Sequence, residues 1–159
     1  MPLMIRPSIN WRAAIYAGVA AGIIATAIQI ILWWAFWDVL PGILYRDARL
    51  TAAIVLGRGV LPPPATFDWA VISVATLIHF ALSITYSIIL ARFITRCGML
   101  FALFVGVLYG SVLFGVNMYG FTMMFPWFAE ARDWITLVTH AVFGGSCAVV
   151  YKVWNTRGC

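Results

Sequence analysis

The sequence predicts an all-α integral membrane protein with four transmembrane helices in an up-down bundle and an interfacial helix between the first two. The chain is 64% hydrophobic and only 9% charged, whereas a soluble domain has roughly 25% charged residues. Its mean hydropathy is +1.00. Four apolar runs reach the ~20 residues that a helix needs to cross a bilayer. In 159 residues, these runs leave no room for a soluble domain, so we expect a single membrane domain over residues 1–159.

The first span is expected at about residues 13–37, after a short basic arm in which Asn10 is a suitable helix cap. A secretory signal is excluded by the length of the apolar run and by its end in WWAFWD, which is no small-residue cleavage site. One face of this span carries small residues and an amide, a pattern that lets another helix approach closely. These residues are Gly18, Gly22, Ala25 and Gln29.

The segment from residue 38 to 68 is predicted to hold an interfacial helix at about 43–57. Its apolar run is too short to span a membrane and carries several charges. They are Arg46, Asp47, Arg49 and Arg58. The prolines at 62–64 then impose an extended linker, and Thr66 or Asp68 is expected to cap the next helix.

The remaining spans are expected at about 69–91, 99–121 and 134–153, and the short turn near residue 97 predicts that the second and third lie antiparallel side by side. Polar residues follow helical spacing in each span. The second carries Thr76, His79, Ser83 and Tyr86. The third carries Asn117 on the face of Ala102, Gly106 and Gly110. The fourth carries Asp133, Thr136, His140, Gly144, Cys147 and Tyr151.

The distribution of basic residues predicts that both termini are cytoplasmic. The inner side would carry Arg6, Arg12, Arg92, Arg96, Lys152 and Arg157, and the outer side Arg46, Arg49, Arg58 and Arg132. This excess on the inner side follows the positive-inside rule. All five acidic residues fall on the outer side. The pI near 9.5 is thereby explained by topology, and no basic stripe with interleaved aromatic residues indicates nucleic acid.

The four spans place their most polar residues in the outer half of the bundle. At ~1.5 Å of rise per residue, His140 lies ~9 Å and His79 ~15 Å below the outer boundary, with Gln29 at ~12 Å and Asn117 at ~6 Å. This convergence predicts a polar site in the outer half. Its residues are His79, His140, Asn117, Gln29, Thr76, Ser83, Tyr86, Thr136 and Asp133.

If the site binds no cofactor, two interpretations of it are open. In the structural one, the polar groups hydrogen-bond one another and hold the helices in register, because an unsatisfied polar group in hydrocarbon costs several kcal/mol. In the functional one, which intramembrane ionisable residues favour, a cavity handles protons or a small solute. Ser83, Tyr86, Cys147 and Tyr151 would continue it inward as a thinner polar track. A chain this small favours a homo-oligomer formed through the glycine-rich faces, or an accessory role in a larger membrane complex.

A third interpretation is a metal or b-type haem site, because two imidazoles from different helices are the ligand set that haem b requires. His79 and His140 would be those ligands; Met118, Met123 and Met124 would suit Cu(I). We expect no enzyme, since no HExxH or GxSxG motif occurs. The odd number of cysteines, Cys97, Cys147 and Cys159, and the lack of a CxxC motif argue against a disulfide framework.

The order of several short motifs resembles the YagU-like bacterial inner-membrane proteins over roughly residues 70–155. The motifs are His79 followed by Tyr86, the glycine-rich third span, the PWF turn at 126–128, Glu130, and His140 about a dozen residues later. The resemblance implies a bacterial inner-membrane location and a function related to protons. The chain departs from the pattern at Asn117, where the family is expected to carry a histidine.

Overall fold

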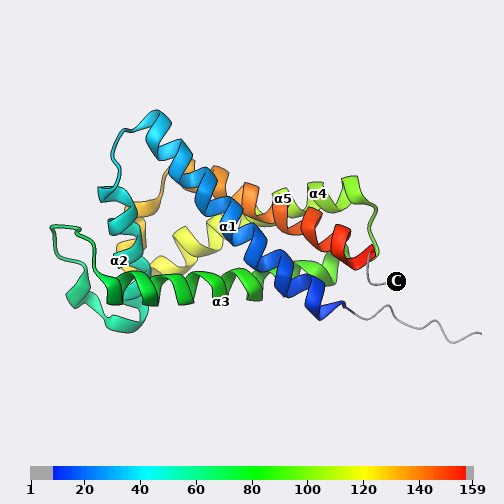
Figure 1. The fold of residues 1–159 in the computed structure, drawn as a ribbon, viewed down its shortest axis with the longest axis horizontal. Coiled ribbons are helices and arrows are strands. Elements are labelled where there is room, and N and C mark those ends of the chain that lie inside the picture. The colour runs from blue at the N-terminus through cyan, green and yellow to red at the C-terminus, as the bar shows by residue number, and fades with distance from the viewer. Residues whose placement is uncertain (1–8, 157–159) are drawn as a thin grey trace, which may run out of the picture.

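A computed structural model describes residues 9–156, so Arg6, Arg157 and Cys159, which entered the charge and cysteine arguments, lie outside the described residues. Five α-helices account for most of the chain (Figure 1). They are α1 (Trp11–Phe36), α2 (Gly42–Leu56), α3 (Trp69–Ile94), α4 (Met99–Gly115) and α5 (Trp134–Thr156). Short 3₁₀ turns cover Arg58–Val60, Phe121–Met123 and Pro126–Ala131, and a π-helical turn covers Val116–Gly120.

The predicted fold class is confirmed. Four stretches are long and apolar enough to span a membrane: Trp11–Phe36, Trp69–Ile94, Met99–Met123 and Trp134–Asn155. The charged α2 lies between the first two of them, and no strand occurs in residues 9–156. Side chains cap the helix starts as expected. Asn10 accepts a 3.1 Å bond from the Ala13 amide, and Asp68, not Thr66, caps α3 through the amides of Ala70 and Val71.

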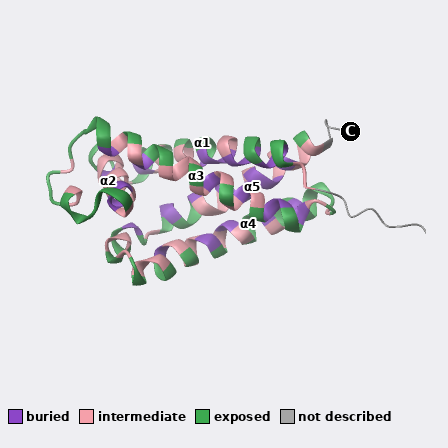
Figure 2. Cartoon of the chain, turned by 90° about the horizontal axis from the view of Figure 1, so that it is seen from below, coloured by how far each residue is buried: buried purple, intermediate pink, exposed green. Residues whose placement is uncertain are grey.

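Helix α5 is the central helix of the bundle, because it packs along both α1 and α4, whereas α3 packs against α1 and α2 (Figure 1). The buried residues lie on the faces that the helices turn toward one another (Figure 2). Glycines permit the two closest approaches. A Cβ at Gly18 would overlap the α3 backbone at Ser83 and Ile84, and one at Gly110 would overlap the carbonyl of His140 on α5. The glycine-rich faces that were expected to support an oligomer are therefore occupied within one chain.

The second and third spans do not pack side by side along their length as the short turn predicted. Although α3 and α4 follow each other, they make few contacts, and α4 diverges from α3 toward the end that carries α2 (Figure 2). Tyrosine side chains bridge part of the gap: the Tyr109 hydroxyl donates a 3.0 Å bond to the Tyr86 carbonyl. The divergence leaves room at the end of the bundle that carries α2.

Three contacts hold α2 across this end of the bundle. The Trp127 indole donates a 2.9 Å bond from Nε1 to the Leu50 carbonyl. Arg49 donates to the carbonyls of Val60 at 2.8 Å and Thr66 at 3.1 Å, which ties the proline-containing linker to the helix. Two of the charged residues that predicted an interfacial helix thus have partners nearby, although Arg49 Nε itself is buried without a hydrogen bond to any described residue. The second is Arg58, whose guanidinium lies 5.8 Å from the centre of the Trp127 ring.

The half of the bundle that lies away from α2 is closely packed. Small side chains of α1, including Ala14 and Ala17 at 0% exposure, meet Leu90 and Ile94 of α3 and Cys147 and Tyr151 of α5 in one cluster. The Ser87 hydroxyl donates a 2.7 Å bond to the Ala14 carbonyl, and the Tyr151 hydroxyl lies 2.9 Å from the Thr95 Oγ1. The predicted polar track toward the cytoplasmic side is thus filled by packed side chains.

Candidate functional site

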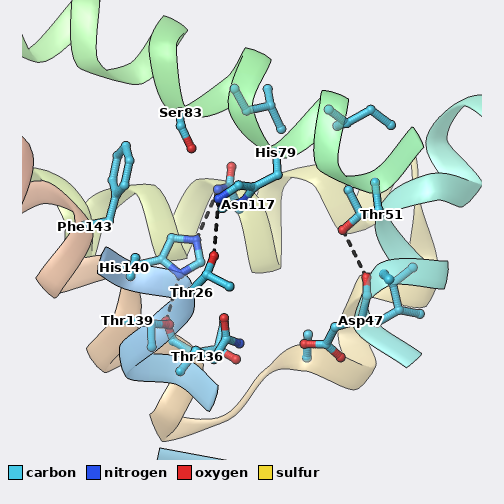
Figure 3. A pocket seen from close by; sticks show the side chains of 18 of the residues that line it. Thr26, Asp47, Thr51, His79, Ser83, Asn117, Thr136, Thr139, His140 and Phe143 are labelled. Carbon is cyan, nitrogen blue, oxygen red and sulfur yellow. Dashed lines mark hydrogen bonds between the residues drawn. The ribbon is translucent and has the colours of Figure 1, made fainter. Parts of the chain in front are cut away.

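A cavity of about 900 Å³ occupies the half of the bundle that carries α2, where α3 and α4 diverge. All five helices contribute to its wall, together with the π-helical and 3₁₀ turns that follow α4. Most of the lining side chains are apolar, among them Ile30, Phe80, Leu113 and Phe143. Figure 3 shows Thr26, His79, Asn117 and His140 close to one another, whereas Asp47 and Thr51 lie apart from them.

The structure brings eight of the nine site residues predicted from sequence into the wall of this cavity. They are Gln29, Thr76, His79, Ser83, Tyr86, Asn117, Thr136 and His140. The exception is Asp133, which does not line the cavity. Its carboxylate accepts a 2.8 Å bond from the Thr136 amide and a 3.1 Å bond from the Thr136 hydroxyl, so it caps the start of α5.

One side of the cavity is a continuous hydrogen-bonded chain across three helices. The Tyr86 hydroxyl donates to Asn117 Oδ1 at 2.8 Å, and Asn117 Nδ2 donates to His140 Nε2 at 3.2 Å. His140 Nδ1 lies 2.8 Å from the Thr136 carbonyl, an obligatory acceptor, so this nitrogen carries the proton of a neutral ring. Every polar atom of the His140 ring therefore has a protein partner.

Asn117 reaches this position because α4 loses its α-helical geometry. The sequence predicted an uninterrupted helix to residue 121, but the α-helix ends at Gly115 and a π-helical turn runs from Val116 to Gly120. Such turns re-aim side chains and occur often at functional sites. Periodicity alone did not reveal this turn.

The opposite side of the cavity, on α1 and α3, is less completely bonded. His79 Nε2 lies 3.4 Å from both the Gly22 carbonyl and the Thr26 hydroxyl, so the Nδ1 of a neutral ring is an acceptor. Within residues 9–156, His79 Nδ1, the Gln29 amide and the Ser83 hydroxyl have no hydrogen-bond partner. Ser83 is only 4% exposed.

Four polar lining residues were missed by sequence reasoning: Thr26, Asp47, Thr51 and Thr139. Thr26 precedes Gln29 by three residues, so helical spacing was a sufficient signal for it. Asp47 and Thr51 were missed because α2 was expected only to lie along the surface, whereas it lines the outer end of the cavity. Arg46 contacts Asp47 at 2.6 Å. Burial nevertheless raises the pKa of the Asp47 carboxyl to about 6. The positive charge of Arg46 lowers this pKa, and the negative charges of Asp133 and Glu130 raise it further.

The residues described contain no group of three or more histidine, cysteine or acidic side chains arranged to hold a metal ion. A haem b between the two imidazoles would require His140 Nε2 to give up its bond to Asn117. Of the methionines considered for Cu(I), Met118 lines the cavity, whereas Met123 and Met124 do not and are 87% and 71% exposed.

Comparisons with protein-family models, with curated proteins and with solved structures find no match to this chain.

Proposed function

We propose that this multi-pass membrane protein, which we take not to be an enzyme, handles protons or a small solute at a polar site in the outer half of its bundle. The observation that carries the proposal is the cavity of about 900 Å³ into which His79, His140 and Asn117 project from three different helices. Ligand sites are typically concave, mostly apolar and equipped with a few convergent polar groups. Imidazoles also change charge near neutral pH, which suits them to proton transfer.

The packing of the inner half supports a site that is reached from the outer half. Cys147 and Tyr151, which were expected to continue a polar track, are each 1% exposed among apolar neighbours. Passage to the other side would require α1 and α5 to separate from that packing. The proposal is therefore a binding site that is closed toward one side of the membrane until the helices move, and not a permanently open pore. We also propose that both termini are cytoplasmic and that the protein lies in a bacterial inner membrane. It would act there as an oligomer or within a larger complex.

The test uses the full chain reconstituted in liposomes. A pH-sensitive dye inside the liposomes measures proton flux, and osmotic swelling in urea or glycerol measures the flux of a small solute. Replacing both histidines, His79→Phe and His140→Phe, should reduce the flux at least about tenfold, equivalent to ~1.4 kcal/mol of barrier. The matched controls are Leu77→Phe and Val138→Phe, which place the same ring on the same helices at exposed positions outside the cavity. The controls should keep the wild-type flux.

Two results would overturn the proposal. One is a wild-type flux no greater than that of empty liposomes in every arm. The other is an unchanged flux in a double histidine variant that folds like the wild type.

The second candidate function is structural, and a specific observation favours it. The chain of Tyr86, Asn117, His140 and Thr136 is satisfied internally and joins α3, α4 and α5. In this reading the polar groups hold the helices of an accessory subunit in register. Loss of folding in His140→Phe, together with normal folding and unchanged flux in His79→Phe, would favour it.

A further inference from the structure

We infer that the cavity binds an uncharged amphiphile that arrives from the bilayer, enters between α1 and α3, and places its polar head against Gln29, His79 and Ser83. The inference rests on the proposed function and deepens it by naming the class of solute and its route. Three features carry it: where the cavity opens, which polar atoms lack partners, and the state of the single charged residue in its wall.

The cavity opens toward lipid. Three of its lining residues, Ile23, Ala27 and Thr76, are exposed on the chain surface. All three lie inside membrane-spanning helices, and Ile23 is at the middle of α1 with 55% exposure. Helices α1 and α3 cross closely at Gly18 and diverge toward the end that carries α2 (Figure 1). In a bilayer this opening meets hydrocarbon, so a membrane-dissolved molecule can enter without crossing the outer aqueous face.

The unpartnered polar atoms lie on the same side as this opening. The α4 and α5 side offers no free ring nitrogen, because His140 is bonded to Asn117 and Thr136. The α1 and α3 side retains an imidazole acceptor, an amide and a buried hydroxyl without partners among the described residues. An unsatisfied polar group within the membrane costs several kcal/mol, so these three groups, which line the cavity, indicate a ligand head or water that both donates and accepts.

The head is uncharged because the cavity offers it no free counter-charge. Apart from the two imidazoles, Asp47 is the one acidic or basic residue among those that line the cavity, and it is paired with Arg46 at 2.6 Å. A charge placed near the bilayer centre without a partner is costly. The apolar body of the ligand would contact apolar side chains of the wall, such as Ile30, Phe80 and Phe143.

The test uses the full chain in nanodiscs with isotope-labelled histidine, since the protein has only two histidines and single replacements assign their signals. Dodecanol is the neutral amphiphilic probe, dodecyltrimethylammonium its charged counterpart with the same tail, and 1,2-propanediol the water-soluble probe. Dodecanol should shift the His79 ring signals in a saturable way and leave those of His140 nearly unchanged. The charged probe should produce less than about a tenth of that shift at equal concentration.

Ala27→Trp places a large ring at the opening and should weaken the dodecanol response about tenfold. Ala35→Trp is the matched control, because Ala35 is exposed on the same helix but outside the cavity wall. Ser83→Ala should also weaken the response without changing the His140 signals.

Each of the other outcomes contradicts one part of the inference. A saturable response to propanediol with none to dodecanol overturns the route from lipid and leaves the proposed function standing. Equal responses to dodecanol and the charged probe overturn the uncharged head. No response of His79 to any probe overturns the inference, and the flux measurement then decides separately on the proposed function.

Discussion

At the scale of single residues, Asn117 joins three helices through one amide group. Its oxygen accepts from Tyr86 on α3, and its nitrogen donates to His140 on α5. A histidine at this position would carry one donor and one acceptor in a different geometry and add a third ionisable ring. The amide keeps this side of the cavity neutral and fixes the orientation of the His140 ring.

Asn117→Leu should lower the free energy of unfolding by about 1–2 kcal/mol, because the Tyr86 hydroxyl and His140 Nε2 then lose their partners. Equilibrium unfolding in mixed detergent micelles measures the difference. Ser111→Ala on the same helix is the control, since the Ser111 hydroxyl bonds only the Val107 carbonyl of its own helix at 3.0 Å. That change should stay within about 0.5 kcal/mol.

A double-mutant cycle with Tyr86→Phe separates the bond from other effects of Asn117→Leu. If the bond contributes, the double variant should be less destabilised than the sum of the two single variants. Strictly additive losses would show that Tyr86 and Asn117 do not stabilise each other.

Of the nine site residues that helical spacing and estimated depth predicted, eight line the cavity, including both imidazoles. They did not predict the bonding. Asp133 shares the face of His140, yet its carboxylate is held by the first turn of its own helix. Whether a carboxylate faces a cavity or caps its own helix depends on local backbone geometry, which periodicity does not contain.

At the scale of elements, α2 shows how an interfacial helix takes part in a membrane site. Its charges predicted a surface position, and Arg49 and Arg58 do contact the outer linker and Trp127. Its alanine-rich face packs on α3, with Ala52 buried beside Val71 and Ala75. That docking turns Asp47 toward the cavity, where its carboxyl has a pKa of about 6.

The docking of α2 should therefore depend on pH. Because burial raises the pKa of Asp47 from 3.8 to about 6, the folded protein binds its proton more tightly than the unfolded chain does. The stability of the fold should increase as pH falls through about 6, by about 1 kcal/mol between pH 7 and pH 5. Unfolding in micelles at several pH values measures the slope, and Asp47→Asn should remove this part of it.

The control for the pH slope is Asp68→Asn. It replaces an exposed acid that caps α3 with another good cap and leaves Asp47 in place. Arg46, Glu130 and Asp133 remain in all variants, so the difference between wild type and Asp47→Asn isolates the Asp47 carboxyl. Equal slopes in those two proteins would contradict the prediction.

At the scale of the whole molecule, composition and the length of the apolar runs were enough to predict the class of fold. The order of packing was not predictable from them. Helix α5 became the central helix because Gly144 and Gly110 let α4 approach it closely, while Gly18 let α1 approach α3. Small residues mark a close contact but do not identify the partner, which can be another helix of the same chain or a second copy.

Orientation in the membrane is the last property that the charges predict, with Cys97 on the cytoplasmic side and the 3₁₀ turn Arg58–Val60 on the outer side. In a Cys159→Ser background, an impermeant maleimide added to intact cells should label Gly59→Cys, an exposed position where a Cβ meets no atom within 4 Å. It should label Cys97 only after the membrane is permeabilised. Cys147 remains unlabelled in either case because it is 1% exposed, and it serves as the internal control. Labelling of Cys97 in intact cells, with Gly59→Cys protected, would reverse the topology and place the cavity in the inner half of the membrane.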